Sequence, residues 1–427
     1  MQFEEFSSLI SNNIIGGMNV KKNINKLIAI GIGLNIIIGN GSPVLASDVI
    51  NDMKINKISG FTENTLKVLT LDKAIEAGIN NDDQMKILSS NLNYYKDLQD
   101  YYDEADNDTG EDQNDVNIDS TKQSKEFRKD AVEYEITNLY NSIVLAEKQV
   151  EYQREIVNNE ETKTGNMKLK YNKGLIDSVS MSKQEASLKT EKDTLQAKIN
   201  SLNDLKEQLK LATGINVNNY TFDDRLNYEK LKLDGDLESY IDDKISIITK
   251  YDRELADLLE DAVDDMKDDD LEMPDKDEFY NIPKTDSDGN IIGYDLNEEA
   301  YNTAKNGALT AYKGYLEAKK GSESASAGVN IKEKKYKNIL RSNYSDILAM
   351  EDGIDQLITN IEIASKSLAN TKLQYQLGLM ATNDYNIAVT GYRQLDISLR
   401  QTLNQYYQLK TVFEKPWVAS SSSLTGQ

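Results

Sequence analysis

Apolar residues recur every seven positions along four stretches of the chain, and polar residues fill most of the positions between them. In the first half of the chain the pattern runs through Ile136, Ile143, Val150 and Val157, and then through Met181, Leu188, Leu195, Leu202 and Leu209. In the second half it runs through Leu340, Ile347, Ile354 and Ile361, and then through Tyr385, Tyr392, Leu399, Tyr406 and Phe413. A seven-residue apolar period is typical of helices that pack side by side as coiled coils. We therefore predict long helices over residues 122–172, 178–213, 331–376 and 382–413.

The two halves are copies of each other. The stretch KLKYNKGLIDS at 168–178 returns as KLQYQLGLMAT at 372–382, so that Gly174 and Gly378 are 204 residues apart. The match extends back to Tyr140 and Tyr344 without an insertion. Because glycine adopts positive φ at little cost, each Gly-Leu pair predicts the turn of a helical hairpin. The fold class that follows is all-α, with two tandem repeats of long antiparallel coiled-coil hairpins.

This repeat gives the domain boundaries. A shorter amphipathic segment precedes each long pair of helices, beginning TLDKAIEAGI in one case and KLDGDLESYI in the other. The second repeat carries an additional acidic insertion between these parts. We divide the chain into a leader and signal peptide at 1–46, a first repeat at 47–218, a second repeat at 219–415 with the insertion at about 260–328, and a disordered tail at 416–427.

The acidic insertion has elements of its own. The stretch FYNIPKTDSDGNIIGYD places Asp288 and Gly289 between strand-forming residues, which predicts a small β-hairpin. A helical stretch follows, and we expect SESASAG at 322–328 to be a flexible linker into the third long helix. In the tail, we expect Trp417 to cap the last helix.

The N-terminal residues have the three parts of a secretory signal. Lys21, Lys22 and Lys26 precede an apolar run at 27–38, and small residues close the segment before Ser47. Acidic residues upstream do not suit such a signal, so we expect translation to start at Met18. An uncleaved membrane anchor is the alternative. In either case the chain is expected to be exported.

Composition narrows the function. The chain has no histidine and no cysteine, which removes disulfides, the commonest metal ligand and the usual nucleophile arrangements, so we predict neither an enzyme nor a cofactor. The formal charge is −23, and residues 252–299 hold 19 acidic against four basic residues. Nucleic acid is therefore not an expected partner, because phosphate contacts need the opposite sign.

One cation site is a narrower hypothesis. Asp286, Asp288, Asn290 and Asp295 approach the spacing of a calcium loop, but the glycine stands at the fourth position instead of the sixth. A solvated hairpin turn is the alternative reading of the same residues.

The signal peptide and the two copies of a unit with Y-x-x-G-L before a final helix resemble the outer membrane efflux protein family typified by TolC, over roughly residues 66–415. The resemblance implies a homotrimer whose hairpins close into a hollow α-helical barrel conducting a small-molecule or peptide solute. It also implies a periplasmic adaptor and a membrane pump as partners. Its implied adaptor contacts at the hairpin tips are Gly174, Leu175, Gly378 and Leu379.

The resemblance further implies a constriction near the second tip. The family narrows its tip with aspartates on the last helix, and Asp384 occupies the first of these positions, with Tyr375 on the facing helix. Met380 and Ile387 depart from the pattern, so a gate held by arginine–aspartate bonds is not expected here. A ring of three Asp384 carboxylates would still favour cations.

The membrane strands of the family have no counterpart in the sequence. A spanning strand needs about 9 to 11 alternating residues, whereas the first repeat offers only NDTGEDQNDVNIDS at 107–120 and the second an acidic segment. We interpret the chain as a relative without these strands, located in the cell envelope, with the extracellular face of the membrane and the outer membrane as alternatives. The competing hypothesis for function is a non-conducting coiled-coil spacer or interaction protein of the envelope.

Overall fold

The computed structural model describes residues 67–268 and 271–421, so the predicted signal peptide lies outside the described residues. The long helices are α4 (Asp83–Glu104), α5 (Asp108–Asn172), α6 (Ser178–Thr213), α7 (Leu237–Asp268), α8 (Glu298–Gln376) and α9 (Thr382–Glu414). Shorter elements are β1 (Lys67–Leu69), α3 (Leu71–Asn81), η1 (Val217–Asn219), β2 (Tyr220–Phe222), η2 (Lys276–Phe279), β3 (Tyr280–Thr285), β4 (Ile291–Leu296) and α10 (Trp417–Ser421). The predicted class of long paired helices is confirmed.

The described residues form two compact units. The larger unit contains described residues 67–90, 123–248 and 336–421, and the smaller unit contains 91–122 and 249–335. Helices α4, α5, α7 and α8 each contribute residues to both. The two predicted Gly-Leu turns belong to the larger unit.

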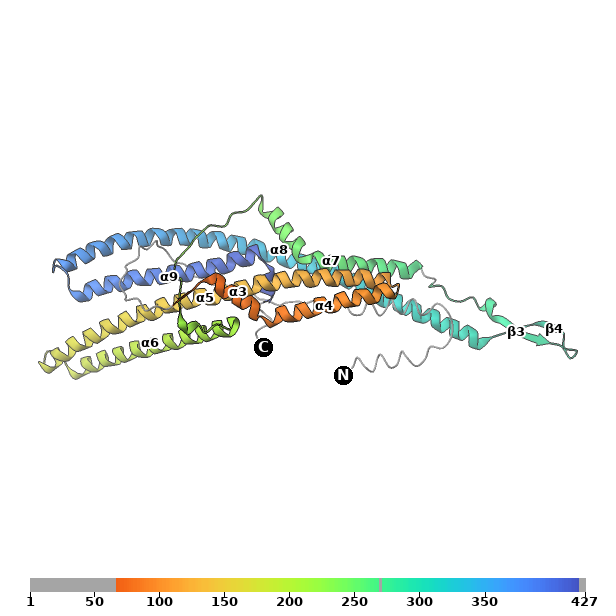
Figure 1. Cartoon of the computed structure of the whole chain (residues 1–427), viewed down its shortest axis with the longest axis horizontal. Coiled ribbons are helices and arrows are strands. Elements are labelled where there is room, and N and C mark those ends of the chain that lie inside the picture. Colours follow the sequence, from red (N-terminus) through yellow and green to blue (C-terminus); the bar gives the residue numbers. More distant parts are fainter. Residues whose placement is uncertain (1–66, 269–270, 422–427) are drawn as a thin grey trace. The chain divides into compact units, whose positions relative to one another are not determined.

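Two antiparallel helical hairpins, α5–α6 and α8–α9, make up most of the larger unit (Figure 1). The residues at the predicted seven-residue spacing on α5 and α8 are all buried: Ile136, Ile143, Val150, Val157, Leu340, Ile347, Ile354 and Ile361. Each fully buried aliphatic side chain contributes about 1.5–3 kcal/mol relative to an exposed one. The seam therefore accounts for the pairing of helices that would be unstable alone.

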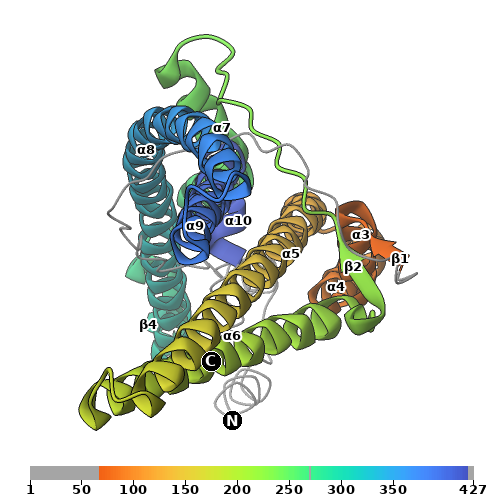
Figure 2. The same cartoon turned by 90° about the vertical axis from the view of Figure 1, so that its left-hand side faces the viewer.

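A small parallel sheet and α3 complete the core of the first repeat. Strand β1 pairs in parallel with β2, and α3 packs beside α6 (Figure 2). The hydroxyl of Tyr140 donates to the carbonyl oxygen of Leu69 at 2.7 Å and accepts from the backbone N–H of Asp223 at 2.7 Å. One buried side chain on α5 thus joins the segments that precede α3 and follow α6.

In the second repeat a buried carboxylate joins the chain segments. Glu351 is buried on α8 and accepts hydrogen bonds from the Tyr406 hydroxyl at 2.7 Å and from the backbone N–H of Leu231 at 2.6 Å. Burial, and then the Glu351 carboxylate, raise the pKa of Tyr406, so the phenol stays a donor. This network fixes the segment before α7 against the α8–α9 hairpin.

In the smaller unit α7 packs against the first part of α8 through small side chains. Ala318 lies with Val263 and Met266, and Ala325 lies with Ala256 and Leu259. The prediction that SESASAG is a flexible linker is wrong, because these residues continue α8 without a break. Ser322 and Ala325 are buried there, and Ala325 packs against α7. The sequence of this stretch alone does not distinguish small residues packed on a second helix from a flexible linker.

The start of α5 also differs from the prediction. The helix begins at Asp108 instead of residue 122, through a polar stretch with few apolar residues. Asn114 is buried and donates to the backbone oxygen of Tyr95 at 2.8 Å and to Gln99 Oε1 at 2.6 Å, both on α4. These hydrogen bonds from the Asn114 side chain join the two helices where the sequence has no apolar seam.

The predicted β-hairpin of the insertion is confirmed as the antiparallel pair β3–β4, visible beyond α8 in Figure 1.

The tail is not disordered over its described part, because Trp417–Ser421 form α10. Trp417 stacks on Phe127 with ring centroids 4.6 Å apart, and its indole N–H donates to Asp130 at 2.8 Å. Trp417 therefore joins the chain's end to α5. Along 67–268 and 271–421, no helix combines the length and apolarity that crossing a bilayer requires.

We predict that Tyr406→Phe lowers the free energy of unfolding by about 2 kcal/mol, because a buried carboxylate loses a hydrogen bond. Urea denaturation followed by circular dichroism measures it. Tyr101→Phe is the control, since that ring is exposed and its substitution should change little. Equal effects of the two substitutions would contradict the role given to Glu351.

Candidate functional site: the two hairpin tips

The turn between α5 and α6 is a Schellman motif centred on Gly174. The Gly174 N–H donates to the Tyr171 carbonyl at 2.8 Å, and the Leu175 N–H donates to the Lys170 carbonyl at 2.9 Å. Gly174 has φ +69°, a value that costs a residue with a Cβ roughly 1–2 kcal/mol. The backbone therefore requires glycine here, independently of any partner.

The turn between α8 and α9 repeats this geometry 204 residues later. The Gly378 N–H donates to the Tyr375 carbonyl at 3.0 Å, the Leu379 N–H donates to the Gln374 carbonyl at 2.9 Å, and Gly378 has φ +73°. Both turns belong to the larger unit and lie at the same end of it in Figure 1. The sequence repeat thus corresponds to a repeat of backbone conformation.

Each tip exposes apolar side chains. Leu175 is 68% exposed and Leu379 is 76% exposed, and further exposed apolar residues flank them: Leu169, Tyr171 and Val179 at the first tip, and Leu373, Leu377 and Ile387 at the second. A hydrophobic residue after the glycine of a Schellman motif commonly packs back onto its helix. Both leucines are instead available to another molecule.

Above the first tip the two helices are joined by polar groups. Gln184 is buried on α6, and its amide donates to Glu160 Oε1 at 2.7 Å and to Thr164 Oγ1 at 3.0 Å, both on α5. The Ser187 hydroxyl donates to the same Glu160 oxygen at 2.9 Å. Burial acts to raise the pKa of Glu160, but these hydrogen bonds outweigh it and hold the pKa below its ordinary value.

Near the second tip an aromatic contact joins the two helices. Tyr375 and Tyr385 stack with ring centroids 4.5 Å apart and planes 6° from parallel. Asp384 lies in the first turn of α9, where the helix dipole favours a negative charge, and its side chain is exposed. The two residues predicted for a constriction therefore lie at one tip, with Tyr375 held by its neighbour and Asp384 open.

The beginnings of α6 and α9 differ in their capping. Asp177 caps α6 by accepting from the Ser180 N–H at 2.7 Å, a hydrogen bond that lowers the pKa of Asp177. The equivalent residue before α9 is Ala381, whose side chain makes no cap. The second tip thus lacks one of the hydrogen bonds that fix the first.

Polar contacts also join the two hairpins to each other along α5 and α9. Arg393 on α9 contacts Glu151 at 3.0 Å and Glu155 at 2.8 Å, and Asn386 donates to Asn159 at 2.8 Å. The sequence predicts none of these contacts. Gln184 could have been found from the sequence, because it is a polar residue between Met181 and Leu188 on an apolar seam. No sequence pattern marks the contacts between the two hairpins.

The calcium hypothesis concerns the turn of the β3–β4 hairpin. Asp286 accepts from the backbone N–H groups of Asp288 at 3.0 Å and Asn290 at 2.9 Å. These bonds lower the pKa of Asp286 and occupy its carboxylate within the turn. The described ranges 67–268 and 271–421 contain no acidic cluster arranged for a metal. The calcium site stays a prediction.

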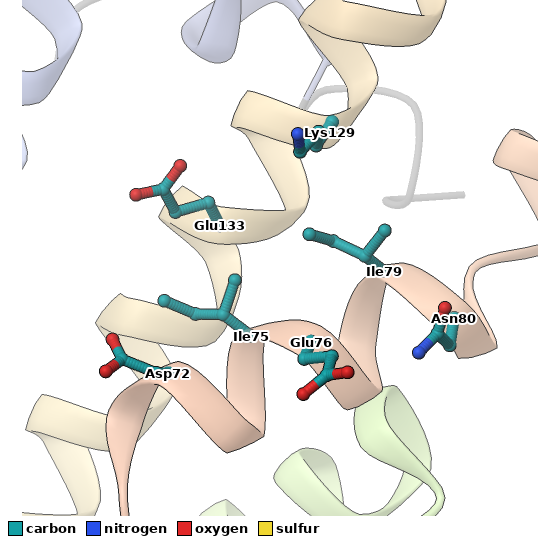
Figure 3. Close-up of a pocket in the computed structure, with 7 residues that line it drawn as sticks. All are labelled: Asp72, Ile75, Glu76, Ile79, Asn80, Lys129 and Glu133. Carbon is teal, nitrogen blue, oxygen red and sulfur yellow. The ribbon is translucent and has the colours of Figure 1, made fainter.

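A separate open recess of about 380 Å³ lies between α3 and α5, lined by Asp72, Ile75, Glu76, Ile79, Asn80, Lys129 and Glu133. In Figure 3 the carboxylates of Asp72, Glu76 and Glu133 do not converge on one point. The recess offers mixed charge beside two isoleucines, without an arrangement that indicates a particular ligand.

Comparison with known proteins gives a fold. No family model matches this chain, and no curated protein matches it. A membrane protein from Pseudomonas aeruginosa of known structure is 9% identical, with a TM-score of 0.55 over 82% of this chain and 91% of that one. The Campylobacter jejuni CmeC outer membrane channel is 12% identical, with a TM-score of 0.48 over 89% and 94%. At 9% identity the likeness to the Pseudomonas aeruginosa protein shows the fold alone, and it covers most of this chain.

We predict that Gly174→Ala and Gly378→Ala each lower the free energy of unfolding by about 1 kcal/mol, because alanine is strained at positive φ. No heavy atom lies within 4 Å of a Cβ built at either glycine, so the effect comes from the backbone. Gly165 is the control: it lies inside α5 with equally open space, and Gly165→Ala should raise the stability by roughly 0.5–1 kcal/mol. A stabilising effect of alanine at the tips would contradict the turn geometry.

Proposed function

We propose that this chain is an exported, TolC-like component of an efflux or secretion system, and that three copies form a helical conduit which docks an adaptor through the hairpin tips. The observation that carries the proposal is the pair of identical Schellman turns at one end of the larger unit. The leucines that they present are 68% and 76% exposed. A coiled-coil spacer would not require matched exposed turns.

In this proposal Gly174 and Gly378 set the shape of the tips, and Leu175 and Leu379 make the contact. A partner with apolar grooves fits them, because an exposed leucine held by a rigid turn loses little conformational entropy on binding. That partner is the adaptor, which would link the conduit to a membrane pump.

The same proposal places the narrowest point of the conduit at the second tip. Asp384 is exposed there, next to the stacked Tyr375 and Tyr385. Three copies would bring three carboxylates and three aromatic pairs together around the axis. Such a ring would favour cationic or neutral solutes over anions.

We predict that Leu175→Asp combined with Leu379→Asp abolishes export of a fluorescent dye from cells that depend on this chain, because a charge would be desolvated at the adaptor contact. The matched control is Leu211→Asp in the last turn of α6, where the leucine is 75% exposed and distant from both turns in the chain.

Export at the wild-type level in the double variant, with the same protein level, would contradict docking through the tips. Unchanged export after deletion of the gene would favour the spacer.

A further inference from the structure

Helix α4 presents aromatic side chains that no part of the described chain covers. Tyr94 is 60% exposed and Tyr101 is 62% exposed, and their seven-residue spacing places them on one side of the helix. Another side of α4 faces α5, where Tyr95 and Gln99 accept the hydrogen bonds of Asn114. Packing within the chain therefore uses a different face of α4.

The first part of α8 presents a second apolar stripe with the same spacing. Leu309, Tyr312 and Leu316 are each about 45% exposed and follow one another at intervals of three and four residues. The face of α8 that packs on α7 is formed by Ala318 and Ala325 instead. At 100° per residue, the exposed stripe lies nearly opposite that seam.

The two stripes lie in segments of opposite charge. Residues 91–104 of α4 contain four acidic residues and one lysine, whereas residues 302–321 of α8 contain four lysines and one glutamate. The α4 stripe has Asp97 and Glu104 beside it, and the α8 stripe has Lys305 and Lys320 beside it. The rest of the smaller unit is strongly acidic, so the basic face of α8 is a local feature.

We propose that the stripe on α4 of one copy packs against the stripe on α8 of a second copy of this chain. The apolar side chains supply a short coiled-coil seam, and the opposed charges orient it and exclude pairing of like faces. Because the two stripes are different surfaces, the contact is head-to-tail, which leaves a free stripe of each kind for the next copy. This contact rests on the proposed function in one respect: it would form one seam between copies in the proposed oligomer.

Cysteine cross-linking tests the contact directly, because the chain contains no cysteine. Full-length chains carrying either Tyr94→Cys or Tyr101→Cys are mixed with chains carrying Leu309→Cys, Tyr312→Cys or Leu316→Cys, and treated with a short bismaleimide. We expect cross-linked pairs in mixtures of an α4 variant with an α8 variant, and at most a tenth as much in either variant alone. Thr310→Cys, exposed on another face of α8, is the control.

Charge reversal tests the orientation. Lys305→Glu with Lys320→Glu should weaken self-association at least tenfold, and combining it with Asp97→Lys and Glu104→Lys on the other copy should restore most of the loss. All four side chains are exposed, so the substitutions should leave the helices intact. Circular dichroism of each variant checks this.

The outcomes separate this inference from the conduit itself. Oligomers without any cross-link between the two stripes would overturn the inference and leave the conduit standing, whereas a monomer would overturn both. Cross-links in single-variant samples would replace the head-to-tail contact with a symmetric one. If the α8 stripe instead binds anionic vesicles and no mixed cross-link forms, its occupant is a lipid surface and the inference is wrong.

Discussion

The length of the helices is the constraint on which the rest of the structure depends. Helices α5 and α8 contain 65 and 79 residues, or about 100 and 120 Å at 1.5 Å per residue, which is far longer than one compact core. Such a helix is stable in water only where another helix covers its apolar stripe. The buried seven-residue seam provides that cover, and it also fixes where each helix must reverse, because a shift of the turn would move the seam out of register.

The position of the turns follows from this register. Glycine at positive φ ends α5 and α8 at equivalent residues, and the same two hydrogen bonds close each turn. The contacts just above the turns are free to differ, and they do: Gln184 and Glu160 make a polar node in one hairpin, and Tyr375 stacks on Tyr385 in the other. The fold thus keeps the backbone of the two tips alike while their side-chain contacts differ.

The sequence predicts the parts of the fold that the repeat and the apolar period determine. The helix ends at 172, 213 and 376 and the starts at 178 and 382 agree with the structure, because glycine or a polar turn marks each. It does not predict the early start of α5, where Asn114 substitutes for an apolar seam, or the continuity of α8 through SESASAG. The composition of a segment concerns that segment alone. Both of these features depend on a second helix that packs against it.

The central claim is that copies of this chain enclose a channel, and electron cryomicroscopy of the purified mature protein tests it most directly. The proposed conduit should give end-on views with three protomers around a hollow centre, and the six hairpin tips should gather at one end. Isolated single hairpin pairs, or a bundle whose centre is filled by side chains, would contradict it.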